Sequence, residues 1–548
     1  MNISYNWLKK YVLLTIDPEE TAKKLTSMGL EVETVETVQT IKGGLEGLVV
    51  AQVVECIDHP DSDHLHITKV DAGDGNLLQV VCGAPNCRAG LKTIFAPVGT
   101  KLYEEDKEFV IKKSKIRGVE SFGMLCAEDE IGIGKSHDGI IELPKDAELG
   151  TPAKKYYNIE DDTLIEVDIT PNRADAISHF GVARDLAAGL GIKLIKPSVS
   201  AFSVDNHDFP IQVTVENHEA CPRYCGLSMT GINVKESPDW LKHRLISIGQ
   251  RPINNVVDVT NFILQELGQP LHAFDGDKIK GNHIFVKTLA DKTPFKTLDE
   301  VTREISDNDL MICNAKEGMC IAGVFGGADS GVTENTKRIF IESAYFNPVW
   351  VRKTARRHSL NTDASFRYER GCDPNITIYA LKRAALLIKE IAGGQVSSDV
   401  IDIYPNPIKD FKVELTYNKL NSLIGKEIPK DTVKSILSGL EIKIDNETED
   451  CLSLSVPPYR VDVQRDVDVI EDILRVYGYN NILPGSDLKS SISYSITPDS
   501  NALQNRVAKQ LTGAGFIEIL NNSLTKLSYY NSLNSYPAEN AVKIMNPL

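Results

Sequence analysis

Carboxylates near the C-terminal end of the 548-residue chain have the spacing of ligands for a hard cation. Asp468, Glu471 and Asp472 stand at i, i+3 and i+4 in the segment RVDVQRDVDVIEDILRVYGY, and Asp462 lies just upstream. On a helix these spacings share one face, and carboxylates suit Mg²⁺. The same pattern also fits a solvated acidic face on which Glu471 pairs with Arg475 at i+4. The spacing alone leaves both interpretations open.

A second group of chemistry-bearing residues lies in five segments from the middle of the chain. Arginine, asparagine, histidine, glutamate and threonine alternate there with apolar residues and a glycine-rich turn, a mixture typical of an apolar pocket with a few placed polar groups. The chain carries no Ser-His-Asp order, nucleophile elbow, Walker loop or HExxH motif. A single histidine such as His272 is more often structural than catalytic. The segments are RPINNVVDVTNFI (251–263), QPLHAFD (269–275), AGVFGGADSG (322–331), FIESAYFNP (340–348) and TDASFRYERGCDP (362–374).

Two basic groups could contact phosphates. In KKSKIRG, the side chains of Lys113, Lys115 and Arg117 alternate onto one face of a predicted strand. The surrounding residues 42–155 hold 14 Lys/Arg against 19 Asp/Glu, so charge argues against nucleic-acid binding there. The second group is a helix face next to the predicted pocket, which either holds a polyanion at the pocket mouth or is an ordinary solvated face. It consists of Arg352, Lys353, Arg356 and Arg357.

Composition limits the classes of protein that fit. The length predicts about four domains, and 42% hydrophobic with 25% charged residues is typical of globular chains. No apolar run reaches the roughly 20 residues of a membrane span, and the N-terminus lacks a signal-peptide core. Ten cysteines without a CxxC pair indicate reduced thiols, so we expect a cytoplasmic protein. A net charge of −16 excludes a generic polyanion binder.

Capping residues, prolines and glycines predict where the elements that position these groups begin and end. Asp17 and Pro18 should begin a helix that ends at Gly29, and a strand should follow. Short alternating strands between residues 48 and 143 predict a small β-barrel or sandwich. A long helix is expected to start at Asp373 and Pro374 and to end at the glycines 393–394. The segment PNPIKD (405–410) reads as a linker before a compact unit.

Together these motifs resemble the beta subunit of bacterial phenylalanine–tRNA ligase, in the family's order and over nearly the whole chain. The matching segments are YNWLKKYV, the barrel stretch from VVAQVVECIDHPDSDHLHITKVDAG to IRGVESFGMLCAEDEIG, the five central segments and PPYRVDVQRDVDVIEDILRVYGYNNI. The resemblance implies an α+β multidomain protein. Its expected parts are an N-terminal α+β domain in two pieces (1–41 and 156–205), an inserted OB-fold tRNA-binding barrel (42–155), a mixed α/β editing domain (206–404), a winged-helix-like unit carrying the acidic helix (409–485) and the start of a catalytic-like domain (486–548).

The resemblance also assigns roles to residues. Those matching the family's Mg²⁺ ligands, at the contact with the alpha subunit, are Asp462, Asp468, Glu471 and Asp472. The family often has Glu where this chain has Asp472. Those matching the editing pocket are Glu342, His272 and Thr362 as catalytic residues and Arg251, Gly326 and Ala364 as substrate-binding residues. The barrel residues expected to contact tRNA are Lys113, Lys115 and Arg117.

The implied function is to support ATP-dependent attachment of phenylalanine to tRNA(Phe) by an alpha subunit, in a heterotetramer of two alpha and two beta chains, and to hydrolyse mischarged Tyr-tRNA(Phe). A hydrophobic pocket rejects an added hydroxyl by only about 10²-fold, whereas a site that hydrogen-bonds the phenol discriminates by about 10⁴–10⁵-fold. Glu342 is the expected acceptor. The alternative is a non-catalytic tRNA-binding scaffold with an inactive pocket. The family's chain also continues beyond the position of residue 548 with further domains.

Overall fold

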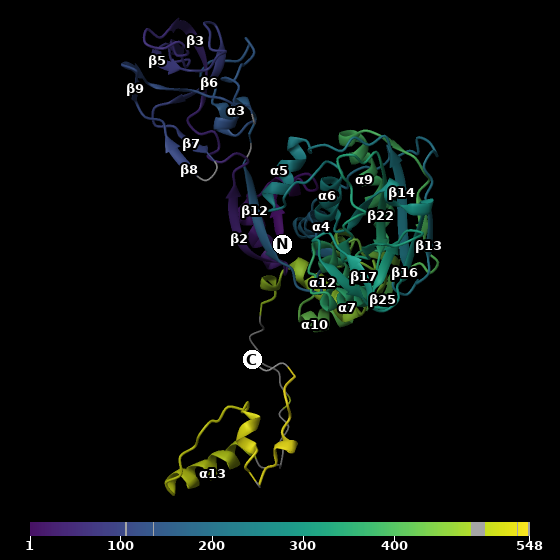
Figure 1. Ribbon diagram of the computed structural model, residues 1–548. Coiled ribbons are helices and arrows are strands. Elements are labelled where there is room, and N and C mark those ends of the chain that lie inside the picture. The colour runs from purple at the N-terminus through teal and green to yellow at the C-terminus, as the bar shows by residue number, and fades with distance from the viewer. Residues whose placement is uncertain are drawn as a thin grey trace. The chain divides into compact units, whose positions relative to one another are not determined.

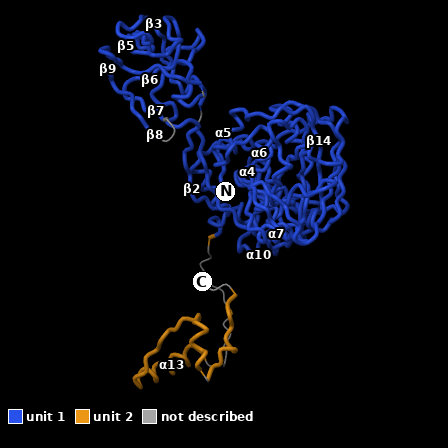
Figure 2. Tube along the Cα trace, in the orientation of Figure 1, with its two compact units in different colours: residues 1–482 blue, residues 483–548 orange. Residues whose placement is uncertain are grey.

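The computed structural model describes residues 1–548 except 105–106, 135, 160, 484–490, 492–498, 534 and 546–548. The chain forms two compact units, residues 1–482 and 483–548 (Figure 2). In the second unit the principal element is helix α13 (Ser500–Gly513). No helix of the described residues is long and apolar enough to cross a membrane.

The first unit begins with a three-stranded antiparallel sheet of order β1-β12-β2. Because β12 comes after the barrel in sequence, the chain on both sides of the barrel contributes to this sheet. Helix α2 confirms the predicted start, since the Asp17 carboxylate accepts from the Glu20 backbone N–H at 2.8 Å. The elements are β1 (Asn2–Ser4), α1 (Tyr5–Leu8), α2 (Pro18–Ser27), β2 (Glu31–Val38), β12 (Asp162–Asp168) and α4 (His179–Leu190).

Between β2 and β12 the chain folds into a nearly closed barrel, which confirms the short strands predicted there. Its main sheet has the antiparallel order β11-β6-β3-β4-β5 (Figure 1). The Phe122 N–H donates to the Gln79 carbonyl oxygen at 2.9 Å, which joins the chain before β11 to β5. The elements are β3 (Val49–Asp58), β4 (His66–Asp71), β5 (Leu77–Cys82), β6 (Lys92–Pro97), β7 (Lys101–Glu104), β8 (Lys107–Val110), β9 (Ser114–Ile116), β10 (Val119–Ser121), β11 (Gly123–Leu125) and α3 (Ala153–Tyr156).

The central part contains two five-stranded sheets. One has the order β13-β16-β19-β20-β21, and the other has the order β15-β22-β14-β23, with β24 also paired to β14. A two-stranded hairpin, β17-β18, accompanies them. The strands are β13 (Gln212–Val215), β14 (Arg223–Thr230), β15 (Leu271–Asp275), β16 (His283–Thr288), β17 (Thr293–Lys296), β18 (Thr302–Ile305), β19 (Leu310–Cys313), β20 (Gly318–Ile321), β21 (Phe325–Gly326), β22 (Arg338–Tyr345), β23 (Gln395–Val396) and β24 (Ile401–Ile403).

Helices α6 and α9 pack on the sheet that contains β14 and β22 (Figure 1). The predicted start of α9 is wrong by three residues, because the Asp373 carboxylate accepts from the Asn375 N–H in a turn that precedes the helix. Its predicted end at the glycines 393–394 is confirmed. The helices are α5 (Asp239–Ser247), α6 (Val257–Leu267), α7 (Pro348–Arg357), α8 (Asp363–Tyr368) and α9 (Thr377–Ala392).

The last part of the first unit packs three helices on a small antiparallel sheet of order β25-β27-β26 around its own apolar core. Helix α12 confirms that the acidic segment is helical. The elements are β25 (Phe411–Thr416), α10 (Tyr417–Ile424), α11 (Lys430–Gly439), β26 (Lys443–Glu447), β27 (Cys451–Val456) and α12 (Asp466–Tyr477).

Candidate functional site

The segments predicted to form a pocket do meet around a cavity of about 230 Å³. Strands β15 and β22 provide one wall, in a register that places His272 directly opposite Glu342. Side chains opposite each other on antiparallel strands lie on the same face of the sheet, so both point into the cavity that they line. The other predicted residues on the cavity wall are Gly326, Thr362 and Ala364.

Glu342 is the buried acid of this pocket. It is 5% exposed, and its Oε2 atom has no hydrogen-bond partner in the described part of the chain. Burial raises the pKa of Glu342 to about 7, against a smaller opposing effect of the Tyr224 hydroxyl. A buried carboxyl oxygen without a hydrogen-bond partner is costly unless a ligand pairs with it. Glu342 is therefore available to accept a hydrogen bond.

His272 presents a neutral imidazole beside this acid. Burial lowers the pKa of His272 to about 4, so the ring is uncharged near pH 7. Its edge-on packing against Phe274, with ring centroids 4.4 Å apart, fixes its orientation. The Nε2 atom is buried without a hydrogen-bond partner among the described residues. The predicted structural role of a lone histidine does not account for this open nitrogen.

Gly326 keeps the space between His272 and Leu298 open. A Cβ atom at this position would lie 3.1 Å from His272 Cε1 and 2.8 Å from Leu298 Cδ1. The Gly326 carbonyl oxygen accepts from the Leu298 N–H at 3.0 Å, which fixes the two segments against each other. A larger side chain would therefore push into the histidine or displace the wall.

Thr362 holds another part of the cavity wall by capping helix α8. Its hydroxyl accepts from the Ser365 N–H at 3.1 Å and donates to the Val324 carbonyl oxygen at 2.9 Å. The hydroxyl is thus already committed to two backbone groups. The geometry gives Thr362 a positioning contribution, and Ala364 adds a small apolar surface to the same wall.

Arg251 does not line the cavity. Its side chain is exposed, although the neighbouring Gln250 amide donates at 3.0 Å to Asp363, which does line it. Sequence reasoning did not single out two polar lining residues, Asn261 and Tyr368. Both lie in segments that the sequence predicts to form the pocket. The mixed polar and apolar composition therefore located the segments, but it did not identify these two residues.

The four predicted metal ligands do not gather at one point. Asp472 is buried and accepts from Arg475 Nε at 2.6 Å and Arg460 Nη1 at 3.1 Å. Arg475 also reaches Asp185 at 2.9 Å, so the alternative pairing of Glu471 with Arg475 is wrong. In the described part of the chain no three His, Cys, Asp or Glu side chains form a group that could hold a metal ion. As arranged, the four carboxylates do not fit one ion.

Asp472 instead belongs to a buried ionic cluster between helices α4 and α12. It joins three arginines to three aspartates, and each aspartate faces at least one guanidinium. Its members are Arg173, Asp175, Asp185, Arg460, Asp472 and Arg475. The remaining acids stay nearer the surface: Asp468 accepts from Arg465 at 2.7 Å, Asp462 from Asn172 at 3.0 Å, and Glu471 is exposed.

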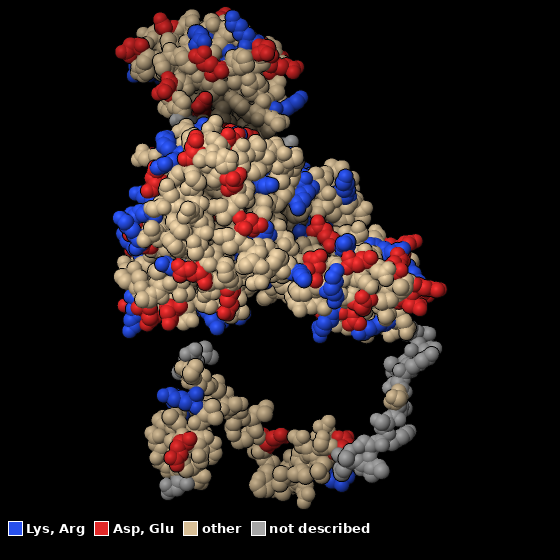
Figure 3. Space-filling model, turned by 90° about the vertical axis from the view of Figure 1, so that its right-hand side faces the viewer, with Lys and Arg blue, Asp and Glu red and all other residues tan. Residues whose placement is uncertain are grey.

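The basic residues of the barrel are only partly as predicted. All three are exposed, but β9 covers Ser114–Ile116 only. Arg117 lies in the following turn with a φ of 42° and donates to the Asp61 carbonyl oxygen at 2.7 Å, so the predicted strand alternation does not extend to it. Lys113 pairs with Glu120 at 2.9 Å. On the face shown in Figure 3, acidic and basic side chains are interspersed, in line with the modest charge of the barrel.

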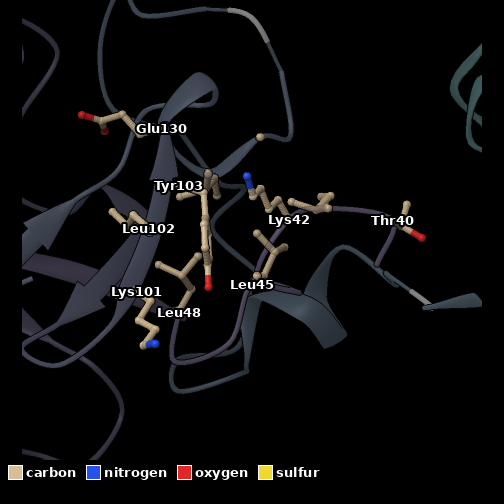
Figure 4. Close-up of a pocket in the computed structure, with 12 residues that line it drawn as sticks. Thr40, Lys42, Leu45, Leu48, Lys101, Leu102, Tyr103 and Glu130 are labelled. Atoms are coloured by element: carbon tan, nitrogen blue, oxygen red, sulfur yellow. The ribbon is translucent and has the colours of Figure 1, made fainter. Parts of the chain in front are cut away.

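The barrel holds a separate cavity of about 190 Å³ (Figure 4). Tyr103 stands upright between Lys42 and Leu48, and the Lys42 ammonium lies 5.8 Å from the Tyr103 ring centroid. None of the residues predicted to bind or catalyse lines this cavity. The pocket around Glu342 therefore remains the candidate site.

Comparison with known proteins agrees with this architecture. Four family models match the chain: the tRNA binding domain at residues 48–152, the B3/4 domain at 220–393, the tRNA synthetase B5 domain at 413–479 and the phenylalanyl tRNA synthetase beta chain CLM domain at 485–548. This set of domains defines a subunit of an aminoacyl-tRNA synthetase. The cavity around Glu342 lies within the B3/4 match.

Curated relatives identify which synthetase. Proteins described as phenylalanine–tRNA ligase beta subunit are 63% identical in Bacteroides fragilis (strain YCH46), 55% in Porphyromonas gingivalis and 40% in Geobacter metallireducens. Each alignment covers 100% of this chain and 68% of the relative. The chain belongs to the phenylalanine–tRNA ligase beta subunit family. Its matched domains include a tRNA-binding module.

Proposed function

We propose that the pocket around Glu342 hydrolyses Tyr-tRNA(Phe), releasing tyrosine and free tRNA by attack of water on the ester. The observation that carries the proposal is the pair of unpartnered buried atoms, Glu342 Oε2 and His272 Nε2, on one face of the β15–β22 pair. Buried polar atoms of folded proteins are nearly always hydrogen-bonded, so two open ones in one cavity favour a polar ligand.

The phenol hydroxyl of tyrosine supplies that ligand. The hydroxyl donates to the Glu342 carboxylate in a charge-assisted hydrogen bond and lies beside the neutral His272. Phenylalanine fills the same space but leaves the buried carboxylate unpaired, a loss that discriminates by about 10⁴–10⁵-fold when a site is built for the hydroxyl. Gly326 and Ala364 leave room for the ring, and Thr362 fixes the wall that faces it. Arg251 is assigned to the exposed surface near Asp363 rather than to the cavity.

Deacylation of preformed Tyr-tRNA(Phe) and Phe-tRNA(Phe) by the assembled alpha–beta enzyme tests the proposal. Hydrolysis of the tyrosyl ester that far exceeds hydrolysis of the phenylalanyl ester is the expected result. No hydrolysis of either ester would overturn it and would favour the alternative, a tRNA-binding assembly scaffold with an inactive pocket.

Several finer assignments from the sequence complete the proposal. We assign the barrel to the OB-fold class, with Lys113, Lys115 and Arg117 as tRNA contacts, and the unit at 409–485 to the winged-helix-like class. The domain bounds given above, a heterotetramer of two alpha and two beta chains, and a cytoplasmic location belong to the same proposal. The assignment of Mg²⁺ to Asp462, Asp468, Glu471 and Asp472 at an alpha-subunit contact stays a prediction, because among the described residues these acids do not gather around one point and Asp472 is paired inside the protein.

A further inference from the structure

Helix α7 (Pro348–Arg357) carries a one-sided positive charge. Its sequence PVWVRKTARR holds four basic residues and no acidic residue. The buried face consists of Val351, Thr354 and Ala355, and Asn347 caps the N-terminus. Arginine and lysine therefore occupy much of the face that remains exposed.

Three of these cations are not neutralised by the protein. Arg352, Lys353 and Arg356 are exposed, and none forms an ion pair within the described residues. Arg357 differs, because it pairs with the buried carboxylate of Asp309. On a chain with a net charge of −16, three adjacent unpaired cations form a local positive surface that attracts anions.

The helix that carries this surface packs against a wall of the candidate pocket. Val351 Cγ2 would be 3.2 Å from a Cβ atom at Gly323, and Gly323 lines the cavity. The chain then passes from α7 to Thr362, which caps α8 and lines the cavity as well. The buried face of α7 therefore packs against the pocket wall, and the three cations lie on the exposed face of the same helix, within one helix diameter of about 10 Å from that wall.

We infer that the exposed face of α7, formed by Arg352, Lys353 and Arg356, binds phosphates of the single-stranded 3′ end of tRNA while the esterified terminal ribose places its amino acid in the pocket. The inference rests on the proposed function. Charge complementarity selects the ligand: an acylated 3′ end necessarily brings its own phosphates to the mouth of the pocket, and cations bind them by releasing counterions. The contact is independent of base sequence, because it is made to the backbone.

The triple variant Arg352→Gln/Lys353→Gln/Arg356→Gln in the assembled enzyme tests the inference. Deacylation of Tyr-tRNA(Phe) should show a KM at least tenfold higher with kcat nearly unchanged. The slope of log KM against log salt concentration should fall by about 2, since each single-strand phosphate contact contributes about 0.7. The matched control is Lys10→Gln/Lys23→Gln/Lys193→Gln, which removes the same charge from exposed positions elsewhere and should leave both values unchanged.

A second measurement does not depend on hydrolysis. An RNA hairpin with the acceptor stem and the single-stranded 3′ end should bind the wild-type enzyme more tightly than the triple variant, whereas a hairpin without the 3′ end should not distinguish them. A tyrosyl ester of adenosine, which lacks phosphates, should be hydrolysed equally by both enzymes. Equal hairpin affinity and equal KM in the triple variant would overturn the inference, whereas a wild-type enzyme that hydrolyses nothing would overturn only the proposed function.

Discussion

Two regions of this chain bury ionisable groups, and only one of them compensates the cost of burial with opposite charges. In the ionic cluster between α4 and α12, burial would raise the pKa of Asp185, but the Arg173 and Arg475 guanidinium groups outweigh it and hold the pKa below its usual value. In the pocket, burial of Glu342 has no cationic counterpart, and the pKa rises to about 7. Full pairing indicates a structural contact between elements, and an unpaired acid indicates a place kept for a ligand.

The largest expected effect is on the paired region. Asp185→Asn leaves three buried arginines facing two aspartates, and breaking a buried ion pair from one side costs about 3–5 kcal/mol. We expect the free energy of unfolding of the first unit to fall by that amount in urea titrations. The matched control is Glu471→Gln, an exposed residue on α12, for which about 0.5 kcal/mol or less is expected. If both variants lost the same small amount of unfolding free energy, the ionic cluster would not stabilise the contact between α4 and α12.

The pH dependence of stability should have opposite signs in the two regions. The pKa of Glu342 is raised in the folded protein, so the fold binds this proton more tightly than the unfolded chain and loses stability as pH rises from about 4.5 to about 7. The depressed pKa of Asp185 gives stability that is present above its ordinary value and lost as pH falls below it. Wild type should therefore lose up to about 3 kcal/mol relative to Glu342→Gln across that window, at 1.36 kcal/mol per pKa unit. Parallel stability curves for the two proteins would place Glu342 in contact with water.

The sequence could predict the segments of the pocket but not the pairing of buried charges. Capping residues and alternation located α2 and the barrel strands, because those signals are local. The orientation of Asp472 depends on Arg460 and on Arg475, which is itself held by Asp185 nearly three hundred positions earlier. The i, i+3, i+4 spacing concerns only neighbours on one helix, so it cannot predict partners that are distant in sequence. It therefore placed Asp472 on an acidic outer face.

The next effect concerns the unpaired region and activity. Glu342→Ala should slow hydrolysis of Tyr-tRNA(Phe) at least tenfold, because losing a charged hydrogen-bond partner costs about 1.5–3 kcal/mol. Phe-tRNA synthesis should remain nearly intact, and His272→Ala should lose less if the imidazole mainly positions the substrate. Deacylation of preformed Tyr-tRNA(Phe) at saturating enzyme measures the two hydrolysis rates, and aminoacylation with phenylalanine measures the synthesis. If Glu342→Ala hydrolysed Tyr-tRNA(Phe) at the wild-type rate, Glu342 would not be the group that recognises the tyrosine hydroxyl.

The smallest expected effect separates Asp468 and Glu471 of α12 from the buried Asp472. If Asp468 and Glu471 contribute to Mg²⁺ at the alpha-subunit contact, Asp468→Asn/Glu471→Gln should weaken assembly and lower aminoacylation by up to about fivefold, the scale of one charged contact near the surface. Hydrolysis of Tyr-tRNA(Phe) in the pocket should survive. Asp472→Asn should instead lower the free energy of unfolding, equally with and without Mg²⁺, because its partners are Arg460 and Arg475. Analytical ultracentrifugation over a Mg²⁺ titration, paired with urea unfolding, distinguishes the two behaviours. If the double variant assembled with the same Mg²⁺ dependence as wild type, Asp468 and Glu471 would not be metal ligands. If the stability of Asp472→Asn depended on Mg²⁺, Asp472 would belong to the metal site.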